Sequence, residues 1–205
     1  MTFDSQTVFV VDDEPVVRKA VSLILEQAGH RIEAFASAAE FLERYDGSQS
    51  GCLVSDVRMP GMDGMEVLRH LSQQGRKIPV VMLSAHGDIP MAIDAVKTGA
   101  IDFLEKPADP DVLRQKVAGA LAMDRTWRLD RDEKQEIEQL ASTLTPRELE
   151  VLRLLVEGKN TKIVAQVLGS SYNTVRVQRA SIMKKMKADN IADLVRMTNL
   201  IQPQK

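Results

Sequence analysis

The first part of the chain, up to about residue 122, alternates short apolar runs with longer stretches that carry apolar residues at helical spacing. The apolar runs lie at 8–11, 31–35, 51–55, 79–84 and 101–107, and the helical stretches at 16–29, 37–45, 63–75, 89–99 and 109–123. Because the runs are almost wholly apolar, they are typical of parallel strands buried on both faces. We therefore expect an α/β domain with a doubly wound, five-stranded parallel sheet, whose ligands bind at the carboxyl ends of the strands.

Charge divides the chain into two parts. Residues 1–121 contain 12 Lys and Arg and 18 Asp and Glu, a formal charge of −6, whereas residues 145–205 contain 11 and 5, a charge of +6. A chain of 205 residues is long enough for two compact domains. We expect an acidic domain over 1–122, a linker over 123–143 and a basic domain over 144–205. The basic domain suggests a polyanionic partner.

Cys52 is the only cysteine, so an intrachain disulfide is excluded and a reducing compartment suits the chain. It lies in an apolar run, where a packed core cysteine is expected instead of a catalytic thiol. No stretch approaches the roughly 18 apolar residues of a membrane span, and the first residues lack the pattern of a secretory signal. These features predict a cytoplasmic protein with no membrane partner.

The second part of the chain is helical throughout. Residues 122–144 contain neither Pro nor Gly, which favours a helical extension of the fifth helix. Trp127 in this stretch is compatible both with packing between the domains and with an ordinary half-exposed helix position. Thr145 and Glu148 form a capping box at the next helix, whose predicted buried face is Leu149, Leu152, Leu155 and Val156. Two short helices then flank the link 170–173, and the second is rich in Arg, Lys, Asn and Gln. This pattern predicts an all-α helix-turn-helix domain of four helices.

Charged and hydroxyl side chains follow the predicted strands of the acidic domain. They are Asp12 and Asp13 after the first strand, Asp56 after the third, Ser84 after the fourth and Lys106 after the fifth. In a parallel sheet these positions share one edge, where adjacent carboxylates repel unless a cation is shared. Oxygen ligands suit Mg²⁺, and a carboxylate nucleophile beside a metal, an ammonium and a hydroxyl suits phosphoryl transfer. We expect Asp56 to be the nucleophile and Pro60, Gly61 and Gly64 to shape a turn over the site.

The segments FVVDDEP, LVSDVRMPGMDG, VMLSAHGD and FLEKP resemble the signature segments of two-component response-regulator receiver domains, which have a flavodoxin-like fold. The resemblance implies that Asp56 is the phosphoacceptor, and that Mg²⁺ or Mn²⁺ is bound directly by Asp13 and Asp56 and partly through water by Asp12. It also implies that the backbone carbonyl of Arg58 is a metal ligand. Ser84 and Phe103 would form a switch pair, and the Lys106-Pro107 peptide would be cis.

The basic domain resembles the DNA-binding domains of the LuxR and FixJ type, through LTPRELEVLRLLVEG, NTKIVAQVLG and TV…RASIMKKM. The residues that this resemblance assigns to DNA contacts are Lys162, Asn173, Thr174, Arg176, Val177, Arg179, Lys184 and Lys185. Arg176 and Gln178 depart from the usual Glu and His, so the operator of close relatives should not be assumed for this chain. Lys162 is expected to contact a phosphate, and Lys184, Lys185 and Lys187 are expected to contact phosphates only, without sequence choice.

Together these features predict a response regulator and transcription factor that is not an enzyme beyond its own phosphoryl transfer and slow dephosphorylation. A histidine kinase would phosphorylate Asp56, and phosphorylation would promote receiver dimers on double-stranded promoter DNA, with RNA polymerase as a further candidate partner. Two other functions are compatible with the sequence. One is a small-molecule phosphohydrolase, although Asp56 lies in SDVR and not in a D-x-D motif. The other is a receiver that docks proteins without phosphorylation, which the complete acidic set disfavours.

The three histidines do not form a metal site in this reading. His30, His70 and His86 are scattered along the chain without metal-ligand spacing. We expect all three at surface or loop positions.

Overall fold

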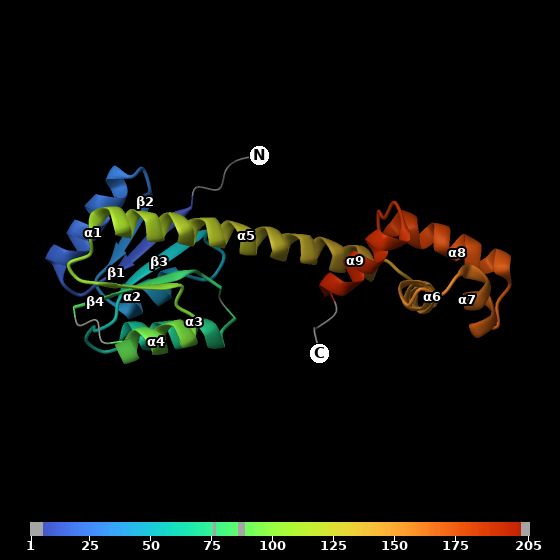
Figure 1. Cartoon of the computed structure of the whole chain (residues 1–205), viewed down its shortest axis with the longest axis horizontal. Coiled ribbons are helices and arrows are strands. Elements are labelled where there is room, and N and C mark those ends of the chain that lie inside the picture. The colour runs from blue at the N-terminus through green and yellow to red at the C-terminus, as the bar shows by residue number, and fades with distance from the viewer. Residues whose placement is uncertain (1–5, 76, 86–88, 202–205) are drawn as a thin grey trace. The chain divides into compact units, whose positions relative to one another are not determined.

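The structure, a computed structural model, describes residues 6–75, 77–85 and 89–201 (Figure 1). Its strands are β1 (Thr7–Val11), β2 (Arg31–Phe35), β3 (Gly51–Asp56), β4 (Val80–Ser84) and β5 (Asp102–Glu105). They form one sheet in the order β2-β1-β3-β4-β5, and every neighbouring pair is parallel. The predicted five-stranded parallel sheet is therefore confirmed.

Helices cover both faces of this sheet. They are α1 (Pro15–Gln27), α2 (Ala38–Arg44), α3 (Gly64–Gln73), α4 (Ile89–Thr98) and α5 (Pro110–Ser142). One core joins Phe9 and Met82 to α2, α3 and α4, and the other joins Val8 and Val81 to α1 and α5. Neighbouring residues of one strand point to opposite cores because side chains alternate along a strand.

Burial explains why the strands have different compositions. The central strands β1, β3 and β4 are buried along their whole length, whereas the edge strands β2 and β5 are partly exposed. Cys52 lies inside β3 with no exposed surface, as expected for a core cysteine. Burial raises the pKa of its thiol far above the ordinary value, with a smaller contribution from the negative charge of Asp124.

The second part of the chain folds as α6 (Pro146–Val156), α7 (Thr161–Val167), α8 (Tyr172–Lys185) and α9 (Ile191–Ile201). Its core includes Val151, Leu155, Val175 and Ile182. The prediction for α6 was partly wrong, because Leu149 is 46% exposed and Val151 takes an inward position instead. The capping box of Thr145 and Glu148 is present, as the sequence predicts.

Helix α5 belongs to both parts of the chain. The two compact units are Met1–Arg128 and Leu129–Lys205, and the boundary between them falls inside α5, which is one continuous helix as far as Ser142. Ile137 is buried in the core of the second unit, and Leu140 and Ala141 pack against that core. In the described part of the chain, neither α5 nor any other helix combines the length and the apolarity needed to cross a lipid bilayer.

Lys187 lies directly after the C-cap residue of α8, Met186, and has a left-handed conformation, with φ 51°. This conformation costs an L-residue with a side chain roughly 1–2 kcal/mol and is open to glycine. The ammonium of Lys187 also pairs with Glu136 at 3.0 Å, but both side chains are exposed and such pairs contribute little. Lys187→Gly is therefore expected to raise the free energy of unfolding of the second unit by up to about 1 kcal/mol, measured by urea denaturation. Glu136→Gln is the control, because it removes only the ion pair; a lower stability for Lys187→Gly than for this control would contradict the prediction.

Candidate functional site

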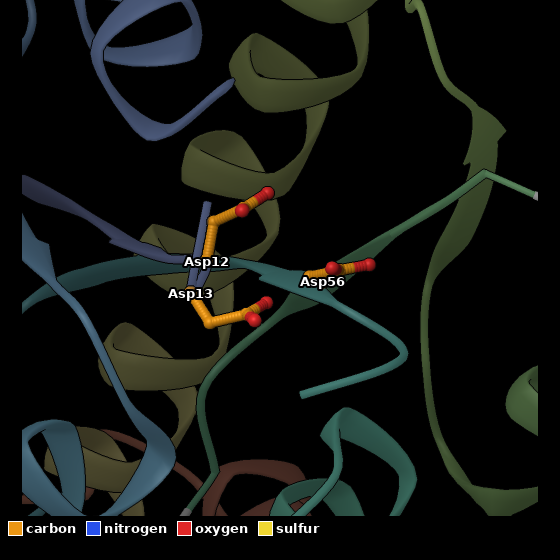
Figure 2. Close-up of side chains that lie close together, drawn as sticks. All are labelled: Asp12, Asp13 and Asp56. Carbon is orange, nitrogen blue, oxygen red and sulfur yellow. The ribbon is translucent and has the colours of Figure 1, made fainter. Parts of the chain in front are cut away.

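Three carboxylates gather at the carboxyl edge of the sheet. Asp12 and Asp13 directly follow β1, and Asp56 is the last residue of β3. One oxygen from each lies within 4.8 Å of the others, and Figure 2 shows the three side chains together at the neighbouring strand ends. Asp12 and Asp56 are buried and Asp13 is partly exposed, so the cluster opens to solvent on the side of Asp13. The convergence predicted from the strand ends is confirmed for these three residues.

Lys106 supplies the positive charge of this cluster. Its ammonium lies 2.7 Å from Asp12 Oδ2 and 2.9 Å from Asp56 Oδ2, and only 10% of its side chain is exposed. Burial acts to lower the pKa of Lys106, but the hydrogen bonds and charges of Asp12 and Asp56 outweigh it and hold the pKa above its ordinary value. One ammonium facing three carboxylates leaves two net negative charges among oxygen ligands. This donor set suits a hard divalent cation.

The loop after β1 is held by its own hydrogen bonds. The backbone N–H of Glu14 donates to Asp12 Oδ1 at 2.9 Å, and Arg18 of α1 donates to the carbonyl of Asp12 at 2.5 Å. These contacts fix both the side chain and the backbone of Asp12. The sequence pattern gave no role to Arg18, although it lies one helical turn inside α1.

The turn after Asp56 needs two of its glycines for different reasons. Gly61 has φ +80°, which glycine adopts without strain. Gly64 begins α3 so close to β3 that a Cβ atom there would lie 2.2 Å from the carbonyl oxygen of Asp56. Asp63 then caps α3 through a capping box with Glu66. Gly64 therefore lets the first turn of α3 pass directly against the backbone of the candidate nucleophile.

The remaining predicted residues lie around this edge. Ser84 is buried at the end of β4, Phe103 packs partly buried against the core in β5, and the Lys106-Pro107 peptide is cis as the resemblance implied. The backbone N–H of Arg58 donates to Asp56 Oδ1 at 3.4 Å, which places Arg58 beside the cluster. The metal contact of its carbonyl and the switch roles of Ser84 and Phe103 stay predictions.

Two of the histidines can be placed. His30 and His70 are partly exposed, and the ring of His70 bonds Gln74. His86 lies outside the described residues.

Helices α7 and α8 form the predicted helix-turn-helix. Asn160 caps α7 by accepting from the N–H of Ile163, and Ser171 caps α8 by accepting from the N–H of Thr174. The side chains of Val175 and Ile182 on α8 are buried in the core of the second unit. The predicted DNA contacts that lie exposed are Lys162 on α7, and Asn173, Thr174, Arg176, Val177, Arg179 and Lys184 on α8. The positions 173, 176, 177 and 184 recur at helical spacing, so α8 presents a continuous outer face.

Lys185 differs from the other predicted DNA contacts. Its ammonium donates to Glu148 Oε2 at 2.6 Å and to the carbonyl of Thr143 at 3.1 Å. Glu148 also accepts from the hydroxyl of Ser181 at 2.6 Å and from the N–H of Thr145 at 2.8 Å. One buried carboxylate of α6 thus holds two side chains of α8. The ammonium of Lys185 already has this internal partner, whereas Lys184 is exposed.

Arg147 holds the other end of the motif. Its guanidinium donates to the carbonyl of Leu168, which ends α7, at 2.7 Å. A cation at this carbonyl satisfies a backbone acceptor that the helix itself leaves open. Neither this contact nor the hydrogen bonds of Glu148 with Ser181 and Lys185 could be predicted from the sequence, because each joins residues about 20 or more positions apart.

Comparison with known proteins gives two family matches. Residues 8–118 match the response regulator receiver domain, and residues 142–198 match the bacterial regulatory proteins of the luxR family. Both descriptions agree with the two predicted resemblances, and neither describes an enzyme family. Residues 119–141 lie outside both matches.

Similar proteins cover nearly the whole chain. It is 40% identical over 197 residues to the transcriptional regulatory protein FixJ of Azorhizobium caulinodans, covering 96% of this chain and 93% of that protein. It is 38% identical over 202 residues to the response regulator protein TodT of Pseudomonas putida, covering 98% and 89%. Among solved structures, the response regulator StyR has a TM-score of 0.84 at 42% identity, covering 95% and 98%. Full-length FixJ from B. japonicum has a TM-score of 0.59 at 35% identity, covering 96% and 97%.

The contacts of Glu148 make the stability of the second unit dependent on pH. Hydrogen bonds from Lys185, then from Ser181 and Thr145, lower the pKa of Glu148 from 4.5 to about 2. A lowered pKa means that the carboxylate stabilises the fold fully above pH 4.5, and that this contribution is lost as the pH falls from 4.5 towards 2. Glu148→Gln is expected to cost about 1–3 kcal/mol at pH 7, and the difference from the parent protein should shrink below pH 4.5. Urea denaturation followed by circular dichroism measures both.

Glu150→Gln is the matched control, since Glu150 lies on the same helix with an exposed side chain. A difference between Glu148→Gln and the parent protein that stayed constant from pH 7 to pH 3 would contradict the role given to the carboxylate.

Proposed function

Because the chain belongs to the two-component response regulators that join a receiver domain to a LuxR-type DNA-binding domain, we propose that Asp56 is its phosphoacceptor and that phosphorylation controls DNA binding. The observation that carries this proposal is the position of the Asp56 carboxylate, at the sheet edge between Asp12, Asp13 and the ammonium of Lys106. The cytoplasm, where a sensor histidine kinase presents its phosphohistidine, is the expected location.

The phosphoryl group moves from a histidine of the kinase to Asp56. An Asp56 oxygen forms a bond to phosphorus, and the bond from phosphorus to the imidazole nitrogen breaks, so the imidazole leaves with the electron pair. Asp12, Asp13, Asp56 and the carbonyl of Arg58 would hold Mg²⁺ or Mn²⁺, which when bound offsets the charge of the transferred oxygens. The ammonium of Lys106 is already within 2.9 Å of the attacking carboxylate.

Ser84 and Phe103 would then transmit the change at Asp56. Ser84 ends β4 in the buried part of the site, and Phe103 lies on the neighbouring edge strand β5. We infer that the hydroxyl of Ser84 turns to the new phosphoryl group and that Phe103 follows inward. The sheet connects both residues directly to the face formed by β5 and α4.

That face offers a surface for receiver dimers. Ile89, Ile93 and Val96 of α4 are large apolar side chains, and between about half and three quarters of each is exposed. Apolar side chains grouped along one helix favour a protein contact over solvent. A receiver dimer would bring two α8 helices to paired half-sites of double-stranded promoter DNA. RNA polymerase is the further partner that transcriptional control requires.

Phosphorylation of Asp56 is tested by mass and by DNA binding together. With acetyl phosphate or beryllofluoride and Mg²⁺, we expect the protein to shift from monomer to dimer and to bind genomic DNA fragments at least about tenfold more tightly, a gain of ~1.4 kcal/mol. Asp56→Asn should lose both responses, because it removes the nucleophile. Glu138→Gln removes an exposed carboxylate of the second unit and should keep both. Dimerisation of Asp56→Asn on addition of either reagent would refute the proposal.

The two adjacent lysines of α8 are expected to behave differently. Lys184→Gln should weaken binding to all DNA sequences equally and reduce the slope of log K against log salt by about 0.9, because one phosphate contact is lost. Its free energy of unfolding should not change, since the side chain is exposed. Lys185→Gln should lower the stability of the second unit, because it leaves Glu148 without its cation.

Fluorescence anisotropy over a salt series and urea denaturation measure these two effects separately. Arg153→Gln is the control, since it removes an exposed cation of α6. Equal loss of stability in Lys184→Gln and Lys185→Gln would contradict the distinction.

A further inference from the structure

Asp124 is a buried charge in the part of α5 that neither family match covers. Its side chain is 1% exposed. Asp124 Oδ2 accepts from the hydroxyl of Ser50 at 2.7 Å, from the N–H of Gly51 at 2.9 Å and from the amide of Gln6 at 3.1 Å. A carboxylate buried to this degree needs such donors to offset its lost hydration. Asp124 is therefore bonded to the first residue of β3 and to the residues before β1 and β3.

Arg128 completes this group one helical turn later. Its Nε donates to both oxygens of Asp124, at 3.0 and 3.1 Å. Its other nitrogens donate to the carbonyl of Ser48 at 2.9 Å and to the carbonyl of Gln49. We call Asp124 and Arg128, with their partners in 48–51, the α5 latch. All six members lie in the first unit.

Apolar contacts hold this part of α5 only weakly. Leu121 is the last of its residues in the core beneath the sheet, and Ala122, Met123, Arg125 and Thr126 are all exposed. Trp127 is half-buried beside a cavity of about 240 Å³ lined by residues of α3 and β4. The α5 latch therefore supplies most of the specific contacts that fix residues 122–128 to the first unit.

The next four residues of α5, 129–132, are exposed and make few contacts with either unit. Leu129 is 65% exposed, and Asp130, Arg131 and Asp132 are also exposed. The ion pair found for this turn is internal, between Arg131 and Asp132 at 3.8 Å. From Glu133 onward α5 contacts the second unit, through ion pairs of Glu133 with Arg196 and of Glu136 with Lys187 and through buried Ile137.

We propose that Asp124 and Arg128 are positioning residues that keep α5 fixed to the receiver as far as residue 128, so that the single turn 129–132 is the part of α5 that changes conformation during signalling. This proposal rests on the proposed function, because the signal is the phosphorylation of Asp56. The α5 latch and Asp56 lie at opposite ends of β3, which runs from Gly51 to Asp56. Because residue 128 is fixed to the start of β3, a conformational change in the receiver is passed to the rest of α5 from this residue.

The only tryptophan of the chain, Trp127, reports on the α5 latch directly. In Arg128→Gln, we expect Trp127 to become more accessible to acrylamide and the backbone amides of 122–128 to exchange about tenfold faster, the equivalent of ~1.4 kcal/mol. Arg128→Lys keeps the charge near Asp124 but cannot reach both carbonyls, and should show a smaller change. Lys134→Gln is the control, because it removes an exposed cation of the same helix outside both the α5 latch and the turn 129–132. Unchanged quenching and exchange in Arg128→Gln would overturn the proposal.

A second experiment distinguishes a positioning role of the α5 latch in signalling from a role in holding α5 alone. Phosphorylation of Asp56 by acetyl phosphate should reach the same extent in Arg128→Gln, Lys134→Gln and the parent protein, because the sheet edge is unaltered. The gain in DNA affinity on phosphorylation should fall about tenfold in Arg128→Gln only. A full gain in a variant whose residues 122–128 exchange faster would overturn the positioning role. A parent protein that is phosphorylated without any gain would instead overturn the proposed function, while quenching and exchange would still decide whether the α5 latch holds α5.

Discussion

The charged edge of the sheet depends on the ion pairs that the ammonium of Lys106 forms with Asp12 and Asp56. Three carboxylates meet there, and two of them, Asp12 and Asp56, share this single cation. Lys106 reaches them from beyond the edge strand, where its backbone N–H also donates to the carbonyl of Ser84 at 2.7 Å. The same residue thus ties the end of β5 to the centre of the sheet and makes a dense negative cluster tolerable. A change in charge at Asp56 therefore acts directly on the ammonium of Lys106, and through this residue on the edge strand β5.

Much of this arrangement could be predicted from the sequence because it follows from local pattern and strand topology. Apolar runs gave the five strands, and parallel pairing then required Asp12, Asp56 and Lys106 to share an edge. Helix caps were also local, as the capping box of Thr145 shows. The buried face of α6 was predicted less well, since apolar spacing alone did not distinguish exposed Leu149 from buried Val151.

Several polar contacts that could not be predicted join residues far apart in the sequence. Glu148 was expected only as a capping residue, yet its carboxylate also holds Ser181 and Lys185 across 33 and 37 positions. Asp124 and Arg128 lie four residues apart on a charged connecting helix, and only the fold reveals that their further partners lie in 48–51. Periodicity indicates which side chains are buried, but not which buried charges find one another.

The burial of Cys52 has a practical consequence for studying the sheet. The chain has one thiol, it lies near the start of the central strand β3, and burial keeps it protonated. A thiol reagent can modify it only when the sheet opens, because the thiolate is the reactive form and is absent from the folded core. The rate of thiol labelling in native buffer therefore measures how often the receiver core opens. It does so independently of the helical domain, which carries no cysteine to contribute to the signal.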